Sequence, residues 1–300
     1  MKFFTQVNIG TLPVQVSLND KVMVLGSCFA DNIGSRMKAA GFDVCVNPFG
    51  TLYNPASILN SVARMESGVP FTNDDCVPMG AGAGLVCSYA HHTSFARPTE
   101  AEFLENANEK LQEASSFWHS CNKVIITLGT AWVWKAKCLI SDNETKKYKS
   151  LTNLLTTEKA SFGVVSNCLK RPSGEFVREM LSVEQIKAII DDLKASFPGK
   201  EFIFTVSPIR HLSDGAHSNT LSKASLHLAI GDSCYFPAFE LLNDELRDYR
   251  FYAEDLVHPS PAAVEFVWEK FLEAAVPVRE WDKIRENEKA ARFAAHRQFR

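Results

Sequence analysis

The chain has 300 residues, a length that allows two domains of ordinary size or one larger α/β domain. Its 32 basic and 35 acidic residues give a net charge of −3, and no run of five like charges occurs, so a basic arm for nucleic acid and an acidic tail are both excluded. Hydrophobic residues make up 46% and charged residues 22%, which excludes a disordered chain.

Signals for export and for membrane insertion are missing from the sequence. The first twenty residues contain one lysine and no apolar stretch of seven or more, unlike a signal peptide, and no run of about 18 apolar residues follows. The eight cysteines form no C-x-x-C pair, and most lie among apolar neighbours. We therefore expect a cytoplasmic protein with reduced, buried thiols and no membrane-inserted segment.

Strands and helices are predicted to alternate along the chain. Short apolar runs predict strands at residues 21–25, 42–46, 124–128 and 201–206. Helical periodicity and capping residues predict helices at residues 28–40, 55–65, 99–118, 182–197, 218–230, 237–248 and 261–275. Two insertions are predicted near residues 68–98 and 135–175, the second polar and irregular, and a charged helical tail at 279–300.

This alternation predicts an α/β fold, a three-layer α/β/α sandwich with a mainly parallel sheet. We expect a single domain over residues 1–278, followed by the tail. In such sheets ligands bind at the carboxyl ends of the strands. Three of the predicted strand ends carry residues capable of chemistry, at 26–27, 129–130 and 207–211.

Ser27 is the first candidate for chemistry. It lies in the turn between a predicted strand and a helix, where the helix dipole favours developing negative charge. The alternative is that Ser27 only caps the helix, which is the usual role of serine at such a position.

Asp255 and His258 form the second candidate, as a D-x-x-H sequence. A carboxylate can accept the imidazole Nδ1–H across one turn and leave Nε2 as a general base. Taken alone, such a pair is more often a surface ion pair than part of a catalytic site. Its position late in the chain, with Ser27 directly after the first strand, gives the order Ser…Asp…His of SGNH or GDSL hydrolases. No G-x-S-x-G sequence is present, which argues against an α/β-hydrolase.

Several ordered sequence blocks resemble those of the GSCFA family, a bacterial group similar to the SGNH/GDSL hydrolases. The blocks are LGSCFA at 25–30, NPFGT at 47–51, HHTSF at 91–95, TLGTAW at 127–132, SPIRH at 207–211 and RDYRFY at 247–252, continuing to His258 and Pro259. The resemblance covers roughly residues 20–270 and implies a flavodoxin-like sandwich. It also implies Ser27 as nucleophile, His258 as general base and Asp255 as the residue that orients it.

The oxyanion donors implied by the resemblance differ in part from those of the wider hydrolase class. The wider hydrolase class supplies a second donor at the place of Gly50 or Asn47. Its third donor, the asparagine of a Gly-x-Asn-Asp sequence, is absent here, because Thr130 and its neighbours occupy that block. Asn47, His91 or His92 would then substitute.

For the other histidines and basic residues, the sequence allows more than one role. His91 and His92 point to opposite faces if they lie on a strand, so a shared metal with His211 or His258 is a minor alternative. Arg210 and His211 either project into the site or pair locally, for example with Asp214. Lys223 lies in another block that resembles the family, but we assign it no role.

The sequence therefore predicts a serine esterase or acyl hydrolase that acts on a small-molecule or glycan ester without a metal or cofactor. An acyltransferase using the same site is one alternative. A non-catalytic SGNH-like binding domain and a histidine-based metal protein are the others. No nucleic-acid partner is expected, and the oligomeric state stays open.

Overall fold

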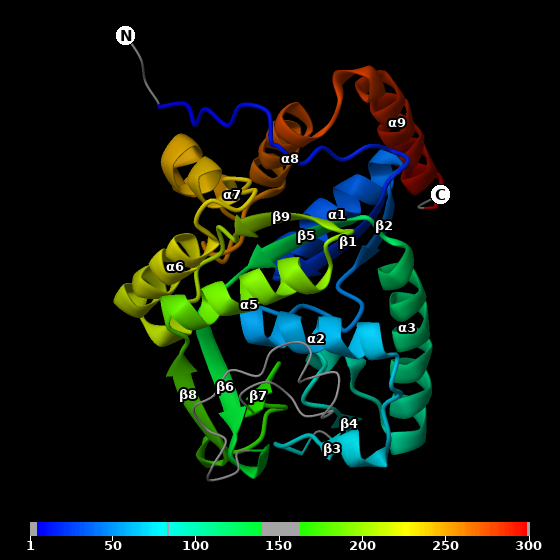
Figure 1. The fold of residues 1–300 in the computed structure, drawn as a ribbon, viewed down its shortest axis with the longest axis vertical. Helices are drawn as coiled ribbons and strands as arrows, with labels where there is room; N and C mark the ends of the chain where they lie inside the picture. The colour runs from blue at the N-terminus through cyan, green and yellow to red at the C-terminus, as the bar shows by residue number, and fades with distance from the viewer. Residues whose placement is uncertain (1–4, 83, 140–162, 299–300) are drawn as a thin grey trace.

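The computed structural model describes residues 5–82, 84–139 and 163–298, and it confirms the predicted α/β fold (Figure 1). Its central sheet is parallel, with the strand order β2-β1-β5-β9. The strands are β1 (Lys21–Gly26), β2 (Asp43–Val46), β5 (Lys123–Leu128) and β9 (Glu201–Val206). A parallel bridge between Phe204 and Tyr235 continues the sheet beyond β9. This order agrees with the flavodoxin-like arrangement.

Helices cover both faces of the sheet, which makes three layers (Figure 1). One face packs against α2 (Pro55–Ser67), α3 (Glu100–Ser120), α5 (Val183–Ser196) and α6 (Ala216–Ile230). The other packs against α1 (Cys28–Ala40), α7 (Ala238–Glu240), α8 (Pro261–Ala275) and α9 (Trp281–Gln298).

Each strand contributes side chains to two separate hydrophobic cores. In β1, Met23 and Leu25 face the α2–α3 side, whereas Val22 and Val24 face the α1–α8 side. All four are at most 1% exposed. Burial on both faces explains why the strands are continuous apolar runs in the sequence.

The β1–α1 connection depends on Gly26. Its φ of 138° lies in a region that L-residues rarely adopt, and a Cβ there would lie 2.1 Å from the carbonyl oxygen of Thr127. Ser27 follows as the N-cap of α1, and the helix ends at Gly41, where φ is 93°. The chain therefore turns from strand to helix directly against the end of β5.

The predicted second insertion is wrong in part, because it contains strands. A small antiparallel sheet has the order β7-β6-β8, built from β6 (Trp132–Ala136), β7 (Val164–Val165) and β8 (Phe176–Met180). Its paired residues are 29 to 48 positions apart in the sequence, so the pairing leaves no local sequence signal. Residues 140–162 of this insertion lie outside the described residues.

The first insertion contains a short antiparallel pair, β3 (Val77–Pro78) and β4 (Val86–Cys87). Figure 1 shows both small sheets at the end of the molecule opposite α8 and α9. The insertions thus extend the domain on one side and leave the central sheet continuous.

The predicted helix at 237–248 is shorter and less regular than expected. After the single turn of α7, Leu241–Leu246 continues as a π-helix. The predicted tail helix is present as α9, and it packs on the domain: Ile284 is buried, and Asn287 Nδ2 donates to the Ala40 carbonyl oxygen at 2.9 Å. Within the described ranges, no helix combines the length and apolarity required to cross a bilayer.

Replacing Gly26 with alanine should lower the free energy of unfolding by about 3 kcal/mol or more, because the new Cβ overlaps β5 backbone that cannot move aside. Urea denaturation measures this change. Gly199→Ala is the matched control, since its Cβ would meet nothing within 4 Å, and it should be neutral or slightly stabilising. Equal stability of the two variants would contradict this account of the turn.

Candidate functional site

The sequence blocks meet at the carboxyl edge of the central sheet, where backbone hydrogen bonds join them. Leu52 N donates to Gly26 O, and Ser207 N donates to Leu128 O, each at 2.8 Å. Gly129 N donates to Tyr53 O at the same distance. Segments that are far apart in the chain therefore form one connected platform at the end of β1, β5 and β9.

Asp255 and His258 are joined above this platform. His258 Nδ1 lies 2.6 Å from Asp255 Oδ2, and the other carboxylate oxygen accepts from the backbone N–H groups of Val257 and His258 at 2.9 Å. These two backbone donors, and then the imidazole, lower the pKa of Asp255 to about 2. The ionised carboxylate holds the Nδ1 proton, which leaves Nε2 to act as a base.

The side chain that faces His258 Nε2 is Cys28. Its Sγ lies 3.4 Å from Nε2, although the two residues are 230 positions apart. Cys28 is the first residue of α1, where the helix itself provides no acceptor for the backbone N–H. Burial, and then the charge of Asp31, raise the pKa of the thiol, whereas nearby backbone N–H groups and Lys223 lower it.

Ser27 takes the role of a helix cap. Its Oγ accepts from Phe29 N at 3.3 Å, its N–H donates to Thr127 O at 3.2 Å, and the residue is only 1% exposed. The structure therefore brings together Asp255, His258 and Cys28, and it does not bring Ser27 to the imidazole. The sequence reasoning missed Cys28 because it grouped this thiol with buried cysteines; its place at the start of α1 was the available signal.

Asn47 and Gly50, two expected oxyanion donors, are already engaged. Asn47 Nδ2 donates to Asp31 Oδ1 at 2.7 Å, and its Oδ1 accepts from Gly26 N at 2.8 Å. Gly50 N donates to Asn47 O at 2.8 Å, and a Cβ on Gly50 would lie 2.4 Å from His92 Cβ. Both residues thus hold the turn beside α1 in place.

Thr130 is also part of the scaffold. It is 4% exposed, and its hydroxyl lies 3.0 Å from Ser222 Oγ and accepts from Trp132 N at 3.1 Å. Its backbone N–H donates to Tyr53 O at 2.9 Å. Neither donor of Thr130 is directed to a substrate.

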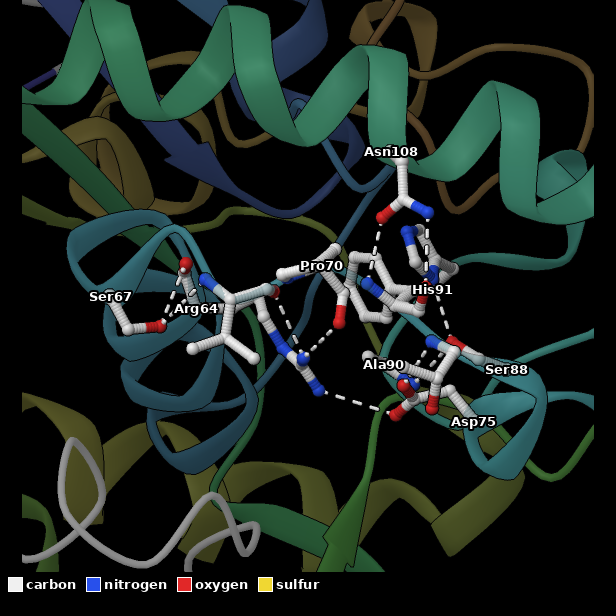
Figure 2. Close-up of polar contacts among 11 residues, drawn as sticks. Arg64, Ser67, Pro70, Asp75, Ser88, Ala90, His91 and Asn108 are labelled. Atoms are coloured by element: carbon white, nitrogen blue, oxygen red, sulfur yellow. Dashed lines mark hydrogen bonds and ion pairs between the residues drawn. The ribbon is translucent and has the colours of Figure 1, made fainter.

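His91 and His92 lie in different environments. His91 is fully buried among phenylalanine rings, and its Nδ1 lies 2.7 Å from Ser88 Oγ (Figure 2). Its Nε2 has no hydrogen-bond partner among the described residues. Burial, with a smaller effect of Arg64, lowers its pKa to about 3. His92 is partly exposed, with Nδ1 3.0 Å from Ser94 Oγ.

No group of three histidine, cysteine or acidic side chains is placed to hold a metal ion in the described part of the chain. His91 and His92 bind different neighbours, so they form no pair of ligands.

Arg210 and His211 diverge after β9. Arg210 Nη2 donates to Tyr252 OH at 3.4 Å, and its guanidinium lies over the Tyr252 ring. His211 packs with its ring centroid 5.5 Å from that of Tyr53. Asp214, the alternative partner, forms an ion pair with Arg178 instead.

His211 keeps an unused polar atom at the site. Its Nε2 is buried, and no described residue accepts from or donates to it. Burial, and then the charge of Lys223, lower its pKa to about 4, so the imidazole is neutral at physiological pH. A neutral imidazole can present an N–H to a substrate oxygen.

Replacing His91 with phenylalanine should weaken the acid sensitivity of the fold. Below about pH 6.5 the unfolded chain takes up a proton that buried His91 refuses, so stability falls as pH decreases towards 3. Between about pH 7 and about pH 4.5, the variant should lose about 2 kcal/mol less unfolding free energy than the unmodified protein. Urea titrations at both pH values test this, and the exposed histidine variant His217→Asn should keep the full loss. Equal losses in all three proteins would contradict it.

Comparisons with known proteins agree with this arrangement of blocks. The family model described as GSCFA family matches residues 21–271, which is most of the chain and includes both Cys28 and His258. No curated protein and no solved structure matches the chain. The chain belongs to the GSCFA family.

Proposed function

We propose that this protein is an acyl hydrolase or acyltransferase in which Cys28 is the nucleophile, His258 the general base and Asp255 the residue that orients His258. The observation that carries the proposal is the continuous series of contacts, 3.4 Å from Sγ to Nε2 and 2.6 Å from Nδ1 to Oδ2. A nucleophile, a base and a carboxylate in this order make up the triad used in acyl transfer. Cys28 takes the role that the sequence assigned to Ser27.

The electrostatics favour proton transfer at the moment of attack. Because burial raises the pKa of Cys28, the resting group is a thiol. His258 Nε2 takes the thiol proton as sulfur attacks the ester carbonyl, and the resulting imidazolium gives that proton to the leaving alcohol. The product is a thioester on Cys28, which water or a second alcohol attacks while His258 accepts its proton. The carbon–sulfur bond then breaks, and the imidazolium returns the proton to the sulfur, which releases the acid or the new ester and restores the thiol.

Two donors support the tetrahedral oxyanion. The Cys28 N–H stands at the positive end of α1, and Nε2 of neutral His211, which has no partner among the described residues, supplies a side-chain donor next to Tyr53. Each donor of this kind lowers the barrier by roughly 3–4 kcal/mol in enzymes where it has been removed. His211 thus substitutes for the missing asparagine of the Gly-x-Asn block.

The substrate class follows from the location and charge of the site. His258 and Asp255 have side chains 46% and 50% exposed, so the triad lies at the surface, where a bulky ester carrier has access. The near-neutral chain favours an uncharged small molecule or an O-acylated carbohydrate over a polyanion such as nucleic acid. We extend the proposal to a relationship with SGNH/GDSL hydrolases, supported by a nucleophile after the first strand and a late D-x-x-H. A cysteine nucleophile also favours a reducing, cytoplasmic location.

Replacing Cys28 and Ser27 with alanine, one at a time, distinguishes Cys28 from Ser27 as the nucleophile. Cys28→Ala should lower turnover of a panel of acetyl and 4-nitrophenyl esters by at least about 10³-fold, because no thioester forms. Ser27→Ala should keep turnover and lower the unfolding free energy by about 1 kcal/mol, through loss of the helix cap. Mass spectrometry of the tryptic peptide 22–36, which contains Cys28 as its one cysteine, should locate the acyl group.

The opposite pattern, with activity lost in Ser27→Ala and kept in Cys28→Ala, would identify Ser27 and not Cys28 as the nucleophile. Ligand binding that survives Cys28→Ala, with no ester turnover by the unmodified protein, would support the binding-domain alternative.

Asp255→Asn should lower kcat by about 10² to 10⁴-fold, because an amide no longer fixes the Nδ1–H tautomer of His258. Steady-state kinetics measure the effect, and KM should change far less. Glu254→Gln is the control, since it removes a neighbouring exposed carboxylate and should leave kcat unchanged. A similar loss in both variants would mean that net charge and not orientation of the imidazole is responsible.

A further inference from the structure

Lys223 is a buried cation at the carboxyl ends of β5 and β9, and the proposed reaction does not use it. The residue lies on α6 and is 2% exposed. Its Nζ donates to Gly129 O at 2.6 Å and to Ser207 O at 2.7 Å. These carbonyls follow the last residues of β5 and β9, so one ammonium group joins the ends of two neighbouring strands.

We propose that Lys223 is a positioning residue for Cys28: it holds the ends of β5 and β9 together at the edge of the sheet where Cys28 lies, and its positive charge stabilises the Cys28 thiolate. The proposal rests on the assignment of Cys28 as the nucleophile. It gives a role to a buried lysine, a residue type that is almost never fully buried without a functional or structural partner.

The groups around Cys28 have opposing effects on the stability of its thiolate, and Lys223 is one of those that favour it. Burial and Asp31, one turn further along α1, disfavour the thiolate. Tyr53, in the segment before α2, interacts electrostatically with the thiolate, and His258 contacts the thiol from the Asp255 loop. Lys223 lies at the same edge of the sheet, because its partner Gly129 follows Thr127 by two residues and the Thr127 carbonyl oxygen accepts from Ser27 N, next to Cys28. Its charge lowers the pKa of the thiol, and it belongs to neither the Asp255 loop nor α1. Removing it should therefore make the thiolate less stable.

The charge of Lys223 itself depends on pH, so a pH series distinguishes an electrostatic role of Lys223 from a purely structural one. Burial lowers the pKa of this lysine to about 7, and the interaction with Cys28 opposes that change. Lys223 is charged below that pH, so its effect on the thiolate is present there and disappears as pH rises above it. A lysine that only braced the strands would show no such dependence.

The experiment compares alkylation of Cys28 by iodoacetamide in the unmodified protein and in Lys223→Met, followed on the tryptic peptide 22–36. We expect Lys223→Met to react about threefold to tenfold more slowly at about pH 6, and at nearly the same rate at about pH 9. Lys200→Met is the matched control, because Lys200 Nζ also donates to two backbone carbonyls, those of Trp118 and Cys121, at the opposite edge of the sheet. It should react as the unmodified protein does at both pH values.

Two results would overturn the proposal: equal alkylation of Lys223→Met and the unmodified protein at about pH 6, or the same reduction at both pH values. If Lys223→Met does not fold, the pH profile in His258→Asn, which removes the imidazolium, decides the question. The logarithm of the alkylation rate should then rise with a slope below one between about pH 6 and about pH 8, as Lys223 loses its charge. A slope of one throughout would overturn the proposal.

These measurements need no turnover, so they stand apart from the test of the reaction. If Cys28→Ala keeps full esterase activity, the proposed function fails while the alkylation results still report whether Lys223 stabilises the thiolate.

Discussion

The close approach of β1 to β5 at Gly26 is the constraint on which the site depends. The two backbones leave no room for a side chain, since a Cβ on Gly26 would meet the carbonyl of Thr127 at 2.1 Å. The same carbonyl accepts the N–H of Ser27, so the chain leaves the sheet and enters α1 within one residue. Because of this tight turn, Cys28 stands at the first position of the helix, with the helix dipole directed at its thiol.

Most polar residues of the shared blocks maintain this edge and take no part in chemistry. Asn47 links Gly26 to Asp31, and Thr130 and Ser222 fix the segment after β5. A platform built from so many backbone partners is stiff, which a triad needs if its distances are to stay within hydrogen-bonding range. In the proposed reaction, the atoms that react belong to Cys28 and His258, and His211 supplies a hydrogen-bond donor.

The fold was largely predictable because burial on both faces leaves strong patterns. The four central strands are apolar runs, and α1 and α5 begin at serines whose side chains cap them. The small sheet of β6 and β8 was not predictable, since its pairing is between segments far apart in sequence and its strands are only partly buried. Capping and periodicity are local signals, whereas pairing of distant strands is not.

The sequence by itself determined the pairing of Asp255 with His258 and the position of a candidate nucleophile directly after the first strand. Both are local properties, set by three residues across one turn and by a strand followed at once by a helix. Only the tertiary structure decided which of two adjacent side chains meets the imidazole. Ser27 and Cys28 point in different directions at the turn, so the hydroxyl caps the helix while the thiol faces His258. That choice depends on how a loop 230 residues away packs over α1, which no local pattern encodes.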